Sequence, residues 1–420
     1  MSKIKVVVSC PIDTYSGYGA RSRDLVKALL KTGKYDVKIL AQRWGNTRFG
    51  YLNDHKEAEL ASLIIPQLTA KPQVWMQVTV PNEFQPVGEY NIGVTAGIET
   101  TICDPSWIEG LNRMNLNLVS SNHAKQTFVN SRFNIEKDGQ MQGTVELQKP
   151  VEVLFEGADL EKYFVTPSNL ELSEVKEDFA FLFVGHWLQG DFAQDRKNVG
   201  YMIKAFLEVF KNKKKQPALI LKTQSANASI LDRDAILKKI DNIRQTVNGT
   251  LPNIYLVHGE MSDEDINHLY NHSKVKAMVS FTKGEGFGRP LLEFSLMNKP
   301  IVASNWSGHI DFLDSEFNYL VNGILTKVHQ SAAIKNMILP ESEWFTPNDG
   351  HAGQGLRDVF ENYKKYSELA KRQGYKSRTN FSFDKMVEQL DSILSANMPA
   401  FAQPVELKMP TLSLPKLQKI

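Results

Sequence analysis

The sequence predicts an α/β protein of two domains, each built around a mostly parallel sheet. Short apolar runs alternate with helical patterns in both halves of the chain, which is typical of parallel sheets whose strands are connected by helices. A polar stretch at 166–177 has neither periodicity and separates the two halves, so the linker is expected near residue 172. A chain of 420 residues is long enough for two domains of ordinary size.

The first half of the chain opens with a strand over 4–10, a near-continuous apolar run that is expected to be buried on both faces. A loop with Gly17 and Gly19 then leads into a helix that ends at Gly33. This order is that of a doubly wound domain, in which the loop glycines either let a ligand approach the helix start or only make turns. The polar segment 132–149 is expected to be a surface excursion. Further strands are predicted over 37–40, 74–78, 91–96, 116–121 and 151–155.

The second half repeats this organisation. A helix is expected over 199–210, and another begins at Ser262, an N-cap with Asp265 in the reciprocal position. The acidic pair Asp232 and Asp234 is interpreted as a helix start rather than a metal site. Strands are predicted over 179–184, 218–221, 254–257, 277–281 and 301–304.

Four segments result from this pattern. The N-terminal domain is expected to cover 1–172 and the C-terminal domain 173–380. Residues 381–396 carry a last amphipathic helix, predicted over 383–394. The prolines that follow exclude a regular helix from 397–420. This segment is predicted to be either an extended segment that lies across a surface or a disordered tail.

Composition limits the classes of function. The hydrophobic share of 42% and the charged share of 23% are typical of a globular protein, and a net charge of +2 does not by itself predict nucleic-acid binding. The two cysteines, Cys10 and Cys103, are too few for a disulfide framework or a metal cluster and favour a reducing compartment. No apolar run reaches the ~20 residues of a membrane span, and the N-terminal run is too short for a signal peptide. The protein is therefore expected to be cytoplasmic.

One glycine-rich loop carries most of the functional information. The strand over 277–281 is followed by three glycines at 284–288 and then by a helix that starts near Pro290. The loop amides and the positive end of that helix suit a phosphate or a sugar oxygen, whereas the carboxylates of Glu285 and Glu293 suit neutral hydroxyls. A nucleotide sugar carries both kinds of group. The alternative is a loop that only packs closely, because a glycine loop alone is weak evidence.

The paired glutamates Glu285 and Glu293, with seven residues between them, are the strongest of several motifs shared with one enzyme family. Further matches lie at 118–121, 154–159, 298–304 and Ser307-Gly308. On these motifs the chain resembles glycosyltransferase family 4. Its members are retaining enzymes with the GT-B architecture, in which two Rossmann-like domains face a central cleft. The segments around 15–19 and 80–83 look similar to glycosyltransferases encoded by tailed phages. The resemblance also implies that the final helix, in 381–396, packs back on the N-terminal domain.

The resemblance implies a role for each matching residue of the loop. Glu285 would lie beside the hydroxyls of the donor sugar, and Glu293 would hold the ribose hydroxyls of the nucleotide. The backbone amides of Gly286, Phe287 and Gly288 would lie along the donor's sugar and phosphates.

The resemblance also places basic residues against the diphosphate. Lys197 matches the family's lysine, whereas His186 stands where the family usually has an arginine. Arg196 either substitutes for that arginine or faces solvent, and His186 is either a ligand or a structural histidine. Gly17 and Gly19 complete the expected donor side.

Lys197 and Glu285 are the expected catalytic residues. Cations already aimed at a leaving diphosphate stabilise its developing negative charge without reorganising, so no metal and no other cofactor is expected. The donor itself, a nucleotide-diphosphate sugar, is a substrate.

Residues on the acceptor side follow strands of the first half. Asn82, Glu83, Glu99 and His123 lie where open α/β sheets bind ligands, and a glutamate or histidine there could accept the proton of an acceptor hydroxyl. For each of them the alternative is a capping or structural role.

Three functions therefore stay open, of which glycosyl transfer agrees best with the motifs. A nucleotide-sugar epimerase of the same architecture is the second, and a binding module without turnover is the third. The acceptor is a carbohydrate, a lipid-linked glycan or a hydroxymethylated base of DNA. The sequence predicts neither the sugar, nor the nucleotide base, nor the oligomeric state.

Overall fold

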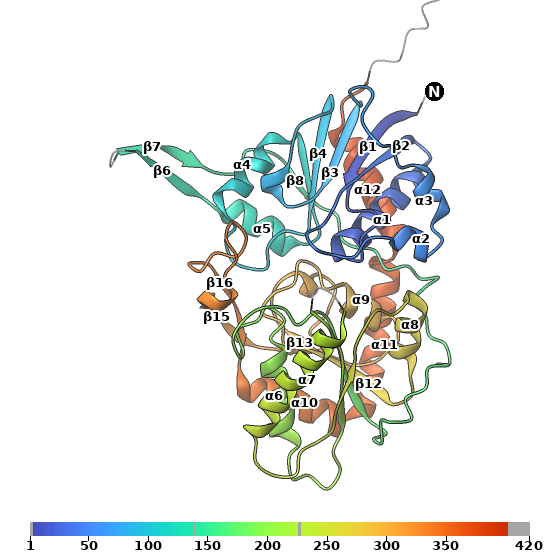
Figure 1. Cartoon of the computed structure of the whole chain (residues 1–420), viewed down its shortest axis with the longest axis vertical. Coiled ribbons are helices and arrows are strands. Elements are labelled where there is room, and N and C mark those ends of the chain that lie inside the picture. Colours follow the sequence, from blue (N-terminus) through green and yellow to red (C-terminus); the bar gives the residue numbers. More distant parts are fainter. Residues whose placement is uncertain (1–2, 138–139, 226–227, 402–420) are drawn as a thin grey trace, which may run out of the picture.

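The computed structural model describes residues 3–137, 140–225 and 228–401. In these residues the chain forms two α/β domains, drawn one above the other in Figure 1, each with a six-stranded parallel sheet. The expected fold class, two Rossmann-like domains of α/β type, is confirmed.

The N-terminal sheet contains every strand that the apolar runs of the first half predict. In spatial order its strands are β2 (Tyr35–Ala41), β1 (Ile4–Cys10), β3 (Val74–Val78), β4 (Tyr90–Thr95), β5 (Leu116–Val119) and β8 (Val151–Val153). Val6 of β1 pairs with Val37 on one side and Val74 on the other, so this strand is central and buried. The associated helices are α1 (Gly17–Thr32), α2 (Tyr51–Asp54), α3 (Ala58–Ser62), η1 (Pro81–Glu83), α4 (Pro105–Arg113) and α5 (Asn122–Asn130).

The C-terminal sheet repeats the arrangement. Its strands, again in spatial order, are β11 (Ile254–Val257), β10 (Ala218–Lys222), β9 (Ala180–Val184), β12 (Val275–Ser280), β13 (Ile301–Ser304) and β14 (Tyr319–Val321). The helices and turns of this domain are α6 (Val199–Phe210), α7 (Ile230–Gln245), α8 (Asp263–Asn271), α9 (Arg289–Ser295), η2 (Gly308–Asp311), η3 (Gln330–Ala332), α10 (Asp349–Glu361) and α11 (Tyr363–Asn380).

Two sequence-based assignments of helix starts are confirmed. Ser262 caps α8 in a capping box with Asp265. Asp232 lies in the first turn of α7, which Ser229 caps, so the acidic pair there is part of a helix start.

Two antiparallel hairpins in the described residues were not expected from the sequence. One pairs β6 (Phe133–Lys137) with β7 (Gln140–Val145) and projects from the N-terminal domain (Figure 1), so the surface excursion at 132–149 is a hairpin. The other pairs β15 (Gly323–Lys327) with β16 (Glu343–Pro347). The strands β6, β7 and β15 are largely exposed and lack the apolar runs by which the sheet strands were recognised. The strand β16 is mostly buried, but only two consecutive residues in it, Trp344 and Phe345, are apolar.

The chain crosses between the domains twice, at neighbouring places. Ala158 and Ser382 form a parallel bridge, in which the Ala158 amide donates to Phe381 and the Phe383 amide donates to Ala158. The expected boundary near residue 172 therefore lies beyond the crossing, and Tyr163 and Val175 already pack in the core of the C-terminal domain. The polar stretch shows no periodicity because it runs over that domain's surface rather than between the domains.

The last helix, α12 (Phe383–Asn397), returns to the N-terminal domain and packs on α1. Met386, Leu390 and Leu394 are buried there in the same apolar cluster as the strands of the N-terminal sheet. Of the predicted tail 397–420, residues 402–420 lie outside the described residues.

Residues 328–342, which we call the strap, join β15 to β16 and lie across the N-terminal domain. Ile338 of the strap packs in one apolar cluster with Trp107 of α4, whose indole Nε1 donates to the Asn336 carbonyl at 2.9 Å. At the end of the strap the Thr101 amide donates to the Glu343 carbonyl at 2.9 Å. The strap is therefore a second connection between the domains, distant in sequence from the crossing.

Candidate functional site

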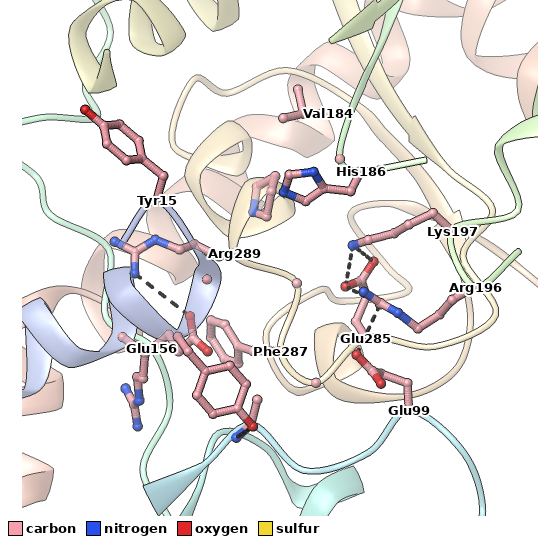
Figure 2. Close-up of a pocket in the computed structure, with 18 of the residues that line it drawn as sticks. Tyr15, Glu99, Glu156, Val184, His186, Arg196, Lys197, Glu285, Phe287 and Arg289 are labelled. Atoms are coloured by element: carbon pink, nitrogen blue, oxygen red, sulfur yellow. Dashed lines mark hydrogen bonds and ion pairs between the residues drawn. The ribbon is translucent and has the colours of Figure 1, made fainter. Parts of the chain in front are cut away.

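A cavity of about 470 Å³ lies between the two domains, at the carboxyl ends of strands from both sheets. The N-terminal domain supplies Tyr15, Gly17, Tyr18, Arg21, Val78, Val94, Thr95, Ala96, Glu99 and Glu156. The C-terminal domain supplies Val184, Gly185, His186, Arg196, Lys197, Lys222, Thr223, Gln224, Glu260, Met261, Ile266 and residues 285–290. Figure 2 shows that charged side chains gather at two places in this cavity.

The glycine loop after β12 forms part of the cavity wall. Glu285 is held in place by its backbone, because its amide donates to Ser307 Oγ at 2.8 Å and its carbonyl accepts from the Gly308 amide at 3.0 Å. Gly288 has φ 97° and caps α9, so Pro290 occupies the second helical position rather than the first. Since α9 has only seven residues, its dipole is weak, and side-chain cations are the larger source of positive charge.

At two positions of this loop, the N-terminal domain lies so close that only glycine fits. A Cβ at Gly284 would lie 2.3 Å from the Glu99 carbonyl oxygen, and one at Gly286 would lie 2.9 Å from the Ala96 carbonyl oxygen. The loop after β12 therefore touches the loop after β4, and the two domains meet backbone to backbone beside the cavity.

The first charged cluster joins Lys197, Arg196, Glu285 and Glu99. Lys197 Nζ lies 2.6 and 2.7 Å from the two carboxylate oxygens of Glu285. Arg196 NH1 lies 3.5 Å from Glu285 and 3.2 Å from Glu99, so its guanidinium bridges carboxylates of both domains. The structure thus brings together the two expected catalytic residues, Lys197 and Glu285. Arg196, for which a solvent-facing position was the alternative, faces this cluster instead.

The pKa of Glu285 follows from this cluster. Burial alone would raise the pKa of its carboxyl, but the charges of Lys197 and Arg196 outweigh burial and lower it to about 2. Burial lowers the pKa of Lys197 despite the opposing charge of Glu285. Glu285 is therefore ionised at neutral pH.

The second charged cluster is centred on Arg289, the first residue of α9. Its Nε donates to Glu293 at 2.9 Å, and its NH1 reaches Asp24 of α1 at 2.5 Å and Glu156 at 3.9 Å. Burial is the main reason why the pKa of Glu293 is raised to about 7, since Arg289 is shared among three carboxylates and offsets burial only in part. Glu293 is not part of the described cavity lining and contacts the cavity through Arg289.

The two N-terminal glycines have different surroundings. Gly17 lines the cavity, and no described atom lies within 4 Å of the position a Cβ would take. Gly19 lies outside the described lining and packs on Thr14, whose carbonyl oxygen would be 2.3 Å from a Cβ. A ligand can therefore approach Gly17, whereas Gly19 serves the turn.

His186 lines the cavity at the end of β9, and its Nδ1 lies 3.0 Å from the Ser225 carbonyl oxygen. Burial lowers the pKa of its imidazole, so the ring is neutral at pH 7 and does not supply the charge of an arginine.

Of the four acceptor-side candidates, Glu99 lines the cavity and the other three lie outside its described lining. Glu83 accepts from Thr79 Oγ1 at 2.5 Å, and the carbonyl of Asn82 accepts from Arg113. His123 lies edge-on to Trp306, and burial lowers its pKa to about 4. The contact with Thr79 gives Glu83 a structural role, and the packing on Trp306 gives one to His123. The hydrogen bond of Asn82 is made by its backbone, and its side-chain Oδ1 has no partner among the described residues.

Sequence patterns did not point to several residues of the site. Arg289 lies between the two glutamates, but its partners Asp24 and Glu156 are distant in sequence. A second cavity of about 320 Å³ adjoins the first at Tyr15, Gly17 and His186, and it is also lined by Trp44 and Arg48 of the loop after β2. Tyr15 and Trp44 lie after predicted strands, a position that could have identified them.

Within residues 3–137, 140–225 and 228–401, no group of three or more His, Cys, Asp or Glu side chains is arranged to hold a metal ion. None of the helices described in these ranges is both long and apolar enough to span a bilayer.

Comparison with known proteins places this geometry in context. Residues 174–339 match the family model described as glycosyl transferases group 1. A search of curated protein sequences finds no match.

Solved structures resemble the whole described chain. A glycosyltransferase from Rickettsia africae ESF-5 superposes with a TM-score of 0.62 at 13% identity, covering 94% of this chain and 99% of its own. HepE from Anabaena, solved in complex with UDP-glucose, has a TM-score of 0.61 at 14% identity, covering 94% and 100%. Sucrose-phosphate synthase from Thermosynechococcus elongatus has a TM-score of 0.61 at 11% identity, covering 94% and 99%. At these identities the likeness establishes the GT-B fold.

Proposed function

We propose that this protein is a retaining glycosyltransferase that moves a sugar from a nucleoside-diphosphate sugar to an acceptor hydroxyl without a metal ion. The observation that carries the proposal is the cluster of Lys197, Arg196 and Glu285 on one wall of the interdomain cavity. The match of 174–339 to the group 1 glycosyltransferase model supports it, because that segment contains all three residues. HepE, which has the same fold, binds UDP-glucose.

The cluster suits a diphosphate leaving group. A diphosphate bound to Lys197 and Arg196 would compete with Glu285 for these cations, and Glu285 would then accept hydrogen bonds from hydroxyls of the donor sugar. When the bond between the anomeric carbon and the diphosphate oxygen breaks, the electron pair goes to that oxygen. The two oriented cations stabilise the resulting charge. Attack by the acceptor on the face that the diphosphate leaves would retain the configuration.

Glu99 is the carboxylate of the N-terminal domain best suited to help the acceptor. It lines the cavity, and Arg196 links it to Glu285 across the domain boundary. A carboxylate there can accept the proton that the acceptor hydroxyl loses, or pass it to the departing phosphate.

The acceptor is proposed to bind in the second cavity, beside Tyr15 and Trp44. One face of Trp44 stacks on Tyr18 at 3.9 Å between ring centroids, which fixes the indole at the cavity wall. Arg48 lies over the ring of Tyr15, with 4.8 Å between its CZ and the ring centroid. Aromatic faces next to Gln224 and Glu260 suit a ring that carries hydroxyls.

The two free, buried cysteines support a reducing compartment such as the cytoplasm.

The reaction is tested with a panel of nucleotides and nucleotide sugars. Thermal-shift measurements identify the donor, because a ligand that binds the folded state raises its stability. Labelled donor is then incubated with candidate acceptors, and released nucleotide and labelled acceptor are quantified. Epimerised donor without labelled acceptor would support the epimerase instead.

Glu285→Gln separates catalysis from binding. The amide keeps the size of the side chain but removes the charge that Lys197 and Arg196 neutralise. We expect transfer to fall about 100-fold while donor binding changes less than tenfold, because such groups act mainly in the transition state. Unchanged turnover in this variant would exclude Glu285 as a catalytic residue, whereas donor binding without any turnover in the parent protein would support a non-catalytic binding module.

Trp44→Ala tests the acceptor cavity. We expect the KM for the acceptor to rise about tenfold, since stacking on an aromatic side chain contributes about 1–3 kcal/mol, while donor binding stays the same. The matched control is Phe49→Ala, an exposed aromatic on the same loop that lies outside the described cavity lining. An equal rise in both variants would exclude a specific role for Trp44.

The acceptor class is distinguished by salt. Arg43 and Arg48 are exposed near the second cavity, and a DNA acceptor would contact them through phosphates. Binding of duplex DNA should then weaken steeply between 50 and 200 mM salt, because counterions are released on binding. Transfer that does not depend on salt would favour a carbohydrate or lipid-linked acceptor.

A further inference from the structure

Lys283 precedes Gly284 in the glycine loop, yet its side chain lies outside the interdomain cavity. It is 3% exposed, and its Nζ donates to Thr346 Oγ1 of β16 at 3.2 Å. The ring of Trp344 lies 5.6 Å from the same atom. Among the residues that the structure describes, Lys283 forms no ion pair with a carboxylate. An ammonium has three hydrogens to donate, so Thr346 satisfies only part of this group.

A buried cation without a paired anion is destabilising. Burial lowers the pKa of Lys283 to about 8, and the charge of Asp195 opposes this effect only partly. A buried charge is normally paired or replaced by an apolar group, because leaving it unpaired costs free energy. The chain keeps a lysine here, beside an open cavity.

This cavity, which we call the rear cavity, has a volume of about 580 Å³. It lies between the start of α6 and the β15–β16 hairpin, and its charged lining consists of Lys283, Lys327, His329 and Asp349. Two lysines against one carboxylate leave it with net positive charge.

Asn198 provides an independent observation. It is 1% exposed, lines the rear cavity and stands at the N-cap of α6 in the left-handed region, with φ 56°. Its side chain does not cap the helix, and its Oδ1 has no hydrogen-bond partner among the described residues. The Asp195 carboxylate accepts from the Val199 amide at 3.1 Å and so covers the first amide of the twelve-residue helix α6, whereas no acceptor is described for the next amides of its first turn, at the positive end of the helix.

We propose that the rear cavity binds a small anion of the phosphate type, held by Lys283, Lys327 and the N-terminus of α6. A phosphate group has several acceptor oxygens, which can take hydrogen bonds from an ammonium and from helix amides at the same time. The Asn198 side chain can rotate its amide nitrogen towards such a ligand, whereas Asp349 lies at the same cavity and disfavours a ligand of larger charge.

The rear cavity lies directly behind the first charged cluster. Asn198 follows Lys197 in the chain, and Lys283 is two residues before Glu285. The Lys283 amide donates to the Arg196 carbonyl at 2.8 Å, and the Lys283 carbonyl accepts from the Phe345 amide at 3.0 Å. An anion there would brace the two backbone segments that carry Arg196, Lys197 and Glu285. Its binding does not depend on the proposed reaction.

The test compares phosphate binding in three variants of the full chain, which are Lys283→Met, Lys197→Met and the double variant that carries both substitutions. Unfolding temperature and calorimetric binding are measured with inorganic phosphate at constant ionic strength and pH 7. In Lys197→Met, which removes a cation from the interdomain cavity, we expect phosphate to raise the unfolding temperature by about 3 °C. In Lys283→Met we expect phosphate to bind no longer in the rear cavity. The double variant, which lacks a lysine of each cavity, should therefore show no rise in unfolding temperature with phosphate.

Lys283→Met removes an unpaired buried charge and is expected to fold. Lys327→Glu, at an exposed position of the same cavity, is a second variant that should weaken phosphate binding at least tenfold. Parallel titrations with a sugar phosphate and with acetate distinguish a phosphorylated metabolite from free phosphate and from a carboxylate. An equal phosphate response in Lys197→Met and in the double variant would overturn the proposal.

Discussion

The two glutamates of the glycine loop stand in opposite electrostatic environments. Glu285 has two cations for one carboxylate, and its pKa is lowered to about 2. Glu293 shares Arg289 with Asp24 and Glu156, so burial dominates and its pKa is raised to about 7. One carboxylate is therefore fully ionised at neutral pH, whereas the other titrates there.

The raised pKa of Glu293 predicts pH-dependent donor binding. A folded-state pKa above the ordinary value of 4.5 means that the proton is lost only as the pH rises through about 7. If Glu293 holds ribose hydroxyls, affinity should increase about fivefold between pH 6 and 8, because an ionised acceptor gives a stronger hydrogen bond by about 1 kcal/mol. Calorimetric titration with a nucleotide sugar, whose diphosphate does not titrate in this range, measures the effect. Glu293→Gln should bind with nearly the same affinity at both values, and an equally steep profile in that variant would exclude Glu293 as the source.

At the scale of elements, the loop after β12 has two neighbours. The sequence indicates that its glycines allow a close approach, and the structure shows that the approaching backbone belongs partly to the N-terminal domain. Gly284 packs on Glu99 and Gly286 on Ala96. The loop therefore positions Glu285 and also sets the distance between the domains.

Gly284→Ala is expected to separate the domains locally. Its Cβ would lie 2.3 Å from a backbone carbonyl oxygen, which a rotamer change cannot relieve. Turnover should fall at least tenfold, because small displacements of reacting groups are costly, while circular dichroism shows that the sheets remain folded. Gly17→Ala is the matched comparison, since the protein has space for its methyl group and any loss of activity reports on the ligand. Full turnover in Gly284→Ala would contradict the importance of this contact.

At the scale of the whole molecule, the domains are connected in three ways. The chain crosses between them at Ala158 and Ser382, the strap packs on α4, and ion pairs of Arg196 and Arg289 span the cavity. Enzymes with a cleft between domains commonly close on their substrates. Here the strap connects the domains at a place distant in sequence from the crossing, so we expect it to limit how far the domains can rotate about the crossing.

Breaking the contact between the strap and α4 should therefore allow the two domains to move apart. Ile338→Asp places a charge in an apolar contact where the parent residue is 9% exposed, so the contact is expected to separate. Hydrogen exchange should increase in the strap and in α4, and the radius of gyration from small-angle scattering should rise, while each sheet stays protected. Lys335→Asp, an exposed position on the strap, is the control and should change neither measurement. Unaltered exchange in Ile338→Asp would mean that the strap does not hold the domains together.

Both sheets and the capping box at Ser262 were predictable from sequence patterns, and the glycines and glutamates of the loop after β12 indicated a ligand site. The bounds of β3, β11 and β13 agree with their apolar runs to the residue, because strands of a parallel sheet that is covered on both faces are mostly apolar. The hairpins β6–β7 and β15–β16 were not predicted, since β6, β7 and β15 are mostly exposed and the buried strand β16 has only two consecutive apolar residues.

Which residues meet across the cavity depends on the tertiary structure. It brought Glu99, but not Asn82, Glu83 or His123, to the cavity, and it gave Arg289 its partner Asp24. Periodicity reports that a side chain is buried within its own element, whereas the group it is buried against lies on another element, often more than a hundred residues away. Ion pairs between domains leave no local pattern, so they appear only when both domains are in place.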